Sequence, residues 1–135
     1  MIETFADLLL QARLQPTPQR LLLVFVVAEL PDDASAEQRA DFAAGVGGAL
    51  VPLMCVDKDA AALASFAALQ AEAAQAGGDW KFVFVAAASL HQPLPEGDPQ
   101  IDALLHGMVE SIRRGDLGNY LAFDKHGIAV QLAAA

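Results

Sequence analysis

The stretch Leu21–Ala28, LLLVFVVA, is apolar at every position and rich in β-branched and aromatic residues. A half-exposed strand alternates apolar and polar residues, whereas a continuous apolar run of this length is typical of a strand covered on both faces. We therefore expect Leu21–Ala28 to be the central strand of a sheet. Helices should pack on both of its faces.

The neighbouring segments predict helices that suit such a sheet. Apolar residues recur at helical spacing over residues 2–14, so we expect an amphipathic helix that ends before Pro16-Thr17-Pro18. After the central strand, Ser35 and Gln38 have the spacing of a capping box and predict a short helix through about Ala44.

The segment Gly47–Asp59, GGALVPLMCVDKD, predicts a second strand over Ala49–Val56. Pro52 has no N–H to donate to a strand ladder, so we expect an edge position, a strand start or a bulge there. A long helix should follow at once, capped by Asp57 or Asp59. Its inward face would consist of Leu63, Phe66, Leu69 and Ala73.

The C-terminal half predicts a third strand, a helix and a hairpin. The strand is Trp80–Ala87, and Asp98-Pro99 is a strong helix start. The strands Asn119–Asp124 and Ile128–Leu132 would form a hairpin, with Gly127 supplying the positive φ of its turn. The apolar stripe of the helix comprises Ile101, Leu104, Leu105, Met108 and Ile112.

These elements alternate between helix and strand along most of the chain, which favours a layered α/β fold of α+β-like character. A length of 135 residues suits one domain, so we expect residues 1–135 to form a single α/β domain. The predicted architecture is a mixed five-stranded sheet packed by three to four helices and ending in a β-hairpin.

The composition indicates which partners to expect. The chain has 8 basic and 17 acidic residues, a formal charge of −9, and no cluster of lysines and arginines. Phosphate backbones and anionic lipids are bound through such clusters, so we expect no nucleic acid and no membrane partner. No apolar run approaches the roughly 20 residues that span a bilayer, and no basic segment of a signal peptide opens the chain. We therefore expect a cytoplasmic protein.

Cys55 is the only cysteine, which excludes an internal disulfide, a C-x-x-C redox pair and a cysteine-rich metal site. Lys58 and a following helix start could lower its pKa and make it a nucleophile. Its apolar neighbours Leu53, Met54 and Val56 favour a small buried hydrophobe instead.

No catalytic constellation is visible, so we assign no catalytic, cofactor-binding or metal-binding residue. The weak catalytic candidates are Cys55, Asp57, Lys58 and His126. The histidines form no H-x-x-x-H or H-E-x-x-H pattern, and we expect no cofactor. A metal site assembled in space from His126 or His91 with loop carboxylates stays an open alternative.

Two runs carry a resemblance across nearly the whole chain: ELPDDASAEQRADFAAGVGGALVPLMCVDKD at Glu29–Asp59 and LAFDKHGIAVQL at Leu121–Leu132. They resemble a family of small uncharacterised proteobacterial proteins often labelled "ribonucleotide reductase subunit alpha". The large subunits of class I reductases use a radical cysteine and a separate reducing pair. One cysteine cannot supply both, so we expect a protein that is not a ribonucleotide reductase catalytic subunit.

The order of elements is also similar to the SseB-type (enhanced serine sensitivity) domain. The resemblance rests on an N-terminal helix, the LLLVFVV strand, an ALVPLM strand that runs into a helix, and the segment GDLGNYLAFD at Gly115–Asp124. It implies antiparallel pairing of the first two long strands and a role without known catalysis. It implies no functional residues.

We therefore expect a small non-catalytic module that binds a protein partner or a second copy of itself, with the terminal hairpin as the exposed sheet edge. The alternative is a small enzyme or ligand-binding protein. Its pocket would lie at the strand ends near Asp57, Lys58, the Ser89–Gly97 loop and His126.

Overall fold

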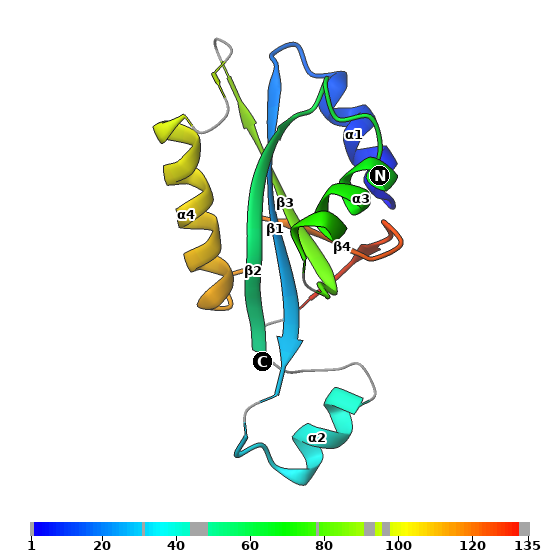
Figure 1. The fold of residues 1–135 in the computed structure, drawn as a ribbon, viewed down its shortest axis with the longest axis vertical. Helices are drawn as coiled ribbons and strands as arrows, with labels where there is room; N and C mark the ends of the chain where they lie inside the picture. Colours follow the sequence, from blue (N-terminus) through cyan, green and yellow to red (C-terminus); the bar gives the residue numbers. More distant parts are fainter. Residues whose placement is uncertain are drawn as a thin grey trace.

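The fold of the chain is a single five-stranded sheet with helices on both faces (Figure 1). This computed structural model describes residues 2–30, 32–43, 49–77, 79–90, 94–95 and 98–132. The elements are α1 (Phe5–Arg13), β1 (Gln19–Glu29), α2 (Ala36–Ala43), β2 (Ala49–Asp59), α3 (Phe66–Ala76), β3 (Phe82–Ser89), α4 (Pro99–Arg113), β4 (Leu121–Asp124) and β5 (Ala129–Val130). The predicted α/β, α+β-like class with a terminal hairpin is confirmed.

The strand order is β2-β1-β3-β4-β5, and each of these four pairings is antiparallel. The prediction of a mixed sheet is therefore wrong for the described strands. The reason is the crossover through α3. Strands β2 and β3 run in the same direction, but β1 lies between them and pairs with both. The antiparallel β1–β2 pairing is also what the SseB-type resemblance implies.

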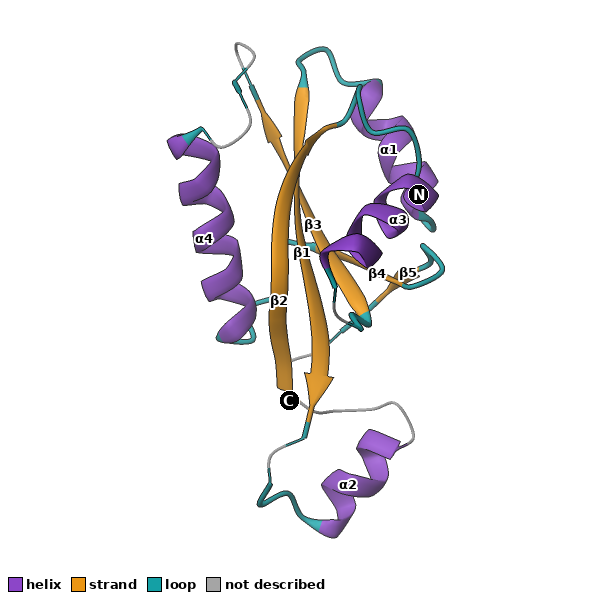
Figure 2. Cartoon of the chain, viewed as in Figure 1, coloured by secondary structure: helices purple, strands orange, loops and turns teal. Residues whose placement is uncertain are grey.

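Strand β1 is an interior strand covered on both faces, as its apolar run predicts, although the middle strand of the five is β3. The side chains of β1 alternate between two separate cores. Leu21, Leu23 and Phe25 pack with α1, α3 and Trp80 on one face. The residues between them face α4 on the other side. Figure 2 shows the resulting three layers, with α4 on one side of the sheet and α1 and α3 on the other.

The two helices with the clearest amphipathic patterns begin at side-chain caps. In α1, Thr4 and Asp7 form a capping box, so the helix begins at Phe5 and not at residue 2. In α4, Asp98 accepts a hydrogen bond from the backbone N–H of Gln100 at 2.8 Å. The predicted stripe of α4 is buried except for Leu104, which lies at the margin of the helix face and is 49% exposed.

Helix α2 lies apart from the layers, beyond the end of the sheet at which β1 ends and β2 begins (Figure 1). Its predicted capping box is confirmed. The N–H of Gln38 donates to Ser35 Oγ at 3.1 Å, and the N–H of Ser35 donates to Gln38 Oε1 at 2.9 Å. Residues 36–41 are exposed, so local hydrogen bonds and not burial hold this part of the helix.

Strand β2 forms one edge of the sheet, which is one of the three placements expected from Pro52. The register of β1 against β2 shifts between Phe25 and Val26, which is the irregularity expected beside a proline. The strand continues to Asp59, so neither Asp57 nor Asp59 caps the next helix. Helix α3 begins later, where Ser65 Oγ accepts from the N–H of Ala68 at 3.1 Å.

Candidate functional site

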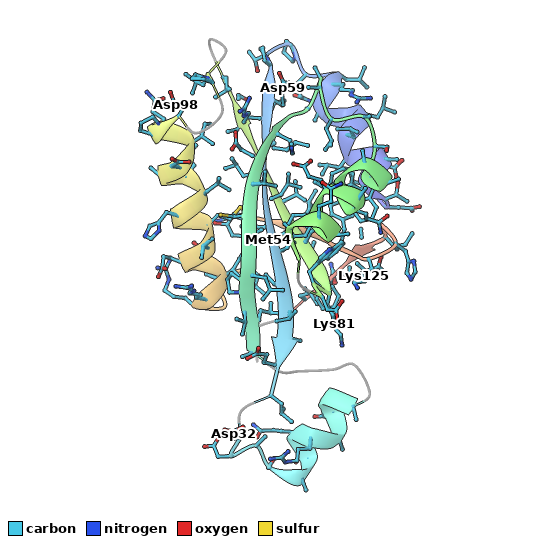
Figure 3. The ribbon with its side chains drawn as sticks, in the orientation of Figure 1. Asp32, Met54, Asp59, Lys81, Asp98 and Lys125 are labelled. Atoms are coloured by element: carbon cyan, nitrogen blue, oxygen red, sulfur yellow. The ribbon has the colours of Figure 1, made fainter. Side chains whose placement is uncertain are left out.

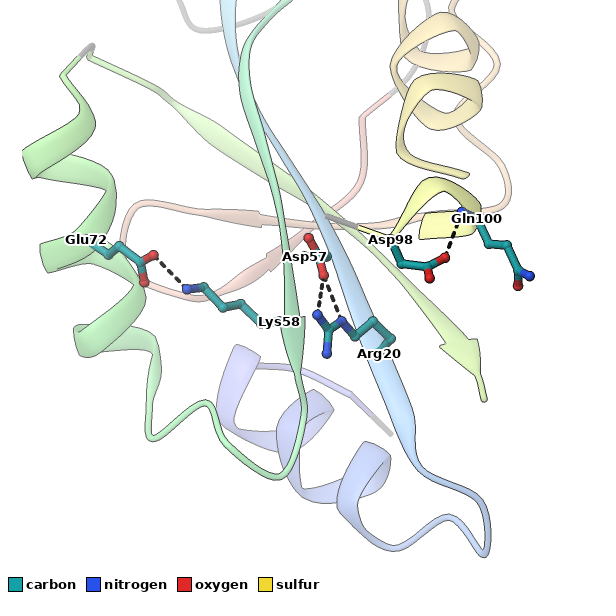
Figure 4. A network of polar contacts seen from close by, with 6 residues as sticks. All are labelled: Arg20, Asp57, Lys58, Glu72, Asp98 and Gln100. Carbon is teal, nitrogen blue, oxygen red and sulfur yellow. Dashed lines mark hydrogen bonds and ion pairs between the residues drawn. The ribbon is translucent and has the colours of Figure 1, made fainter. Parts of the chain in front are cut away.

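The buried charged residues of the described chain are Arg20 of β1 and Asp57 of β2, which are 7% and 8% exposed. Arg20 Nε donates to Asp57 Oδ2 at 2.7 Å (Figure 4). Arg20 Nη2 lies 2.5 Å from the same oxygen, so both nitrogens of the guanidinium face the Asp57 carboxylate.

Such an ion pair is costly to break. Each charge has lost most of its hydration, so removing one partner of a buried pair costs about 3–5 kcal/mol. The pair joins the start of β1 to the end of β2, across 37 residues of sequence. Sequence reasoning singled out Asp57 but missed Arg20. The available signal was a charged residue directly before the apolar run Leu21–Ala28.

A cavity of about 440 Å³ lies beside this ion pair. Four segments surround it: the end of α1 with the turn that follows, the start of β1, the end of β2, and the chain after β3. The lining residues are Ala12, Arg13, Gln15, Pro16, Thr17, Pro18, Gln19, Arg20, Asp59, Ala60, Ala61, Leu90 and Leu94.

Two polar side chains hold the walls of this cavity in place. Gln19 Nε2 donates to Ser89 Oγ at 2.8 Å and to the Thr17 carbonyl at 3.1 Å, which ties β1 to β3 and to the preceding turn. Arg13 Nε donates to the Ala60 carbonyl at 3.0 Å, and its Nη2 donates to the carbonyl of Leu63. The end of α1 is thereby fastened to the end of β2.

Asp57 and Lys58 point to opposite faces of the sheet, as successive residues of a strand do. Lys58 pairs with Glu72 of α3 at 2.6 Å, on the face away from Asp57 (Figure 4). The two residues therefore belong to different environments. Neither lines the cavity beside Arg20.

His126 lies in the β4–β5 turn, where its N–H donates to Asp124 Oδ1 at 2.8 Å. The same turn contacts α3, because Gln70 Nε2 donates to the Lys125 carbonyl. These contacts place His126 two strands away from β1, on which Arg20 lies. His91 lies outside the described residues, and among the described residues no three His, Cys, Asp or Glu side chains form a metal-binding group.

Cys55 is exposed, so the expectation of a buried cysteine is wrong. Its strand is at the edge of the sheet, where a side chain has a paired neighbour on one side only. Cys55 lines a second groove, of about 210 Å³, between β2 and α3. The other lining residues are Phe25, Met54, Val56, Leu69, Glu72, Ala73 and Ala76.

No protein-family model, curated protein or solved structure matches this chain. In the part of the chain that the structure describes, no helix is long and apolar enough to cross a bilayer.

Proposed function

We propose that this protein is a non-catalytic binding module that adds an extended strand of a protein partner to the free edge of β2. The observation that carries the proposal is this edge itself. Strand β2 has 11 residues, pairs with β1 on one side, and has no strand on its other side among the described elements. Such an edge presents unpaired N–H and C=O groups to a partner chain.

The composition of β2 supports the same function. Natural proteins protect a free edge with charged side chains, prolines or bulges. Strand β2 has Pro52 and the neighbouring register shift, but no charged residue from Ala49 to Val56. Leu53 is 44% exposed and Cys55 is exposed beside it. A partner strand would cover these apolar side chains.

The groove between β2 and α3 supplies a place for partner side chains. Met54 lies midway along β2 on the side of α3 (Figure 3), where it packs against the core that contains Leu69. In strand addition, main-chain hydrogen bonds provide affinity and such side pockets provide specificity. The terminal hairpin is a poorer edge than expected, because β5 has only 2 residues.

The first partner to test is a second copy of the chain, because β2 is itself an apolar extended strand. Two β2 strands paired about a two-fold axis would form one continuous sheet. Sedimentation equilibrium should show a concentration-dependent dimer. Leu53→Lys should weaken it by about tenfold or more, since a lysine at the edge opposes strand addition.

Leu121→Lys is the matched control. Leu121 is a leucine of similar exposure on β4, which β1 and β3 separate from the β2 edge, so this variant should dimerise like the wild type. A spin label on Cys55, the only cysteine, adds a distance measurement. Pairing along most of β2 puts the two labelled backbones within roughly 25 Å.

Two results would count against the proposal. If the wild-type chain stays monomeric at high micromolar concentration, self-association is excluded. If Leu53→Lys also retains the same proteins from a native lysate as the wild type, strand addition at β2 is excluded altogether.

A further inference from the structure

On the basis of the proposed strand addition, we infer that a second copy of the chain pairs antiparallel with Leu53–Asp59 of β2 only. The register of this pairing sets the two Cys55 residues opposite each other. In Figure 2, β2 lies in front of the rest of the sheet, and neither α3 nor α4 crosses in front of it. The helices therefore leave the edge open, and the backbone of β2 decides where a second copy pairs.

The hydrogen bonds of β1 determine which backbone groups of β2 point to the free edge. In an antiparallel sheet, successive residues of a strand direct their N–H and C=O groups to opposite neighbours. The Gln19 carbonyl accepts from the N–H of Ala60, just after β2, at 3.0 Å. One residue earlier, the Pro18 carbonyl accepts from the N–H of Leu90, just after β3, at 3.0 Å. Odd-numbered residues from Gln19 to Phe25 therefore bond to β2.

The register of β1 against β2 then gives the direction of each residue of β2. The residues opposite Leu21, Leu23 and Phe25 are those at even positions of this part of β2, and their backbone groups point inward to β1: Lys58, Val56 and Met54. Cys55 and Asp57 lie between them. Their N–H and C=O groups therefore point to the free edge, where a partner strand would pair with them.

The other end of β2 is out of phase with this part. Leu53 is the extra residue of the register shift, so the edge-facing residues change from odd to even numbers beyond it. Pro52 lies opposite Val26, whose carbonyl accepts from the N–H of Lys81, just before β3, at 2.8 Å. Pro52 therefore faces the free edge, where it has no N–H to donate. A regular partner strand follows one phase only, and Leu53–Asp59 is the part with its donors intact.

The side chains of β2 select the register. Edge-facing residues must meet each other across a two-fold axis, so the axis lies at Cys55, Val56 or Asp57. With the axis at Cys55, Met54 meets Val56 of the other copy beside the apolar groove of α3, and no two charged residues meet. The axis at Val56 sets Met54 opposite Lys58, and the axis at Asp57 sets two carboxylates opposite each other. Apolar pairs stabilise a sheet and like charges oppose it, so β2 is self-complementary about Cys55.

A disulfide between the two copies tests this register. The Cα atoms of the two Cys55 residues would lie about 5.5 Å apart, within the span of a disulfide. Diamide should oxidise the two thiols to one S–S bond and be reduced to the hydrazine. The matched control is Leu53→Cys in a Cys55→Ser chain, compared at an equal fraction of dimer. Its two thiols would lie about four residues apart along the paired strands, roughly 14 Å, and should cross-link about tenfold more slowly.

Amide hydrogen exchange tests the extent of pairing without a thiol. Dimerisation should slow the exchange of the Cys55 and Asp57 amides by about tenfold. The amide of Leu50 faces the same edge beyond Pro52, because Leu50 lies opposite Ala28, and it should exchange at the same rate in monomer and dimer.

The outcomes separate this pairing from strand addition in general. If a dimer forms but Cys55 cross-links no faster than the control thiol, or if the Leu50 amide is also protected, the register is overturned and strand addition at β2 stands. If Cys55 and Asp57 amides are not protected in the dimer, both are overturned. A chain that stays monomeric overturns the pairing of two copies, and the lysate comparison with Leu53→Lys then decides strand addition to another protein.

Discussion

Asp7 combines two roles at the start of α1. Its Oδ2 accepts hydrogen bonds from the backbone N–H groups of Glu3 and Thr4, both at 3.1 Å. These two bonds stabilise the carboxylate form and lower the pKa of Asp7 below its ordinary value of 3.8, and the bond from Glu3 has the larger effect. The stability that this cap gives to α1 therefore depends on pH.

The lowered pKa of Asp7 determines whether acid strengthens or weakens the folded state. A lowered pKa in the folded state means that the stabilisation from Asp7 is fully present above pH 3.8 and is lost as the pH falls through the folded pKa. Asp7→Asn should therefore be less stable than the wild type at neutral pH, and the difference should shrink in acid. Urea unfolding at a series of pH values measures it, and a difference that is constant with pH would contradict the assignment.

Two glycines should respond in opposite directions to alanine. Gly107 lies within α4 and an added Cβ would meet nothing within 4 Å, so Gly107→Ala should stabilise the fold by about 0.5–1 kcal/mol. Gly127 has φ +77°, and its Cβ would lie 3.0 Å from Phe66 Cδ2. Gly127→Ala should destabilise by about 1–3 kcal/mol, as chemical denaturation of the two variants would show. Equal effects of the two substitutions on stability would disprove the described geometry of the turn at Gly127.

At the scale of elements, the chain contains two capping boxes with the same chemistry and different surroundings. Thr4 and Asp7 cap α1, whose apolar face is buried against the sheet. Ser35 and Gln38 cap α2, whose residues 36–41 are exposed. Loss of the cap lowers the global free energy of unfolding when the helix packs on the core. When the helix does not pack on the core, loss of the cap makes only that helix unfold more often.

Thr4→Ala and Ser35→Ala test this difference as a matched pair. Thr4→Ala should lower the global free energy of unfolding by about 1 kcal/mol. Ser35→Ala should leave it unchanged and instead speed amide hydrogen exchange over residues 36–43, because α2 opens without the core. Equal losses of global stability in the two variants would show that α2 is coupled to the sheet.

At the scale of the whole molecule, the formal charge of −9 acts on the proposed self-association. Two copies of the chain repel each other, so strand addition between copies is opposed at low salt.

Salt should therefore tighten the dimer. Going from about 0.1 M to about 1 M NaCl shortens the screening length from roughly 10 Å to roughly 3 Å. The dimer should become several-fold tighter in sedimentation equilibrium. A dimer affinity that stays constant or falls as salt is added would mean that the charge does not act as described.

Much of the fold was predictable because its signals are local. The continuous apolar run of β1, the helical spacing in α4 and the capping residues Ser35, Gln38 and Asp98 each act within a few residues of chain. Pro52 limited its strand to an edge, a strand start or a bulge, because a missing N–H restricts where a strand can lie. Periodicity and capping are properties of short segments, so one sequence is enough to read them.

The parts that were not predictable depend on which strands become neighbours. Cys55 is exposed because β2 lies at an edge, although its run of apolar neighbours is typical of a core. Arg20 meets Asp57 across 37 residues, and the cavity beside them draws on four separate segments. The sequence by itself determined most of the elements and the burial of β1 on both faces. Only the tertiary structure decided the strand order and with it the candidate site, since strand pairing depends on contacts that no local pattern contains.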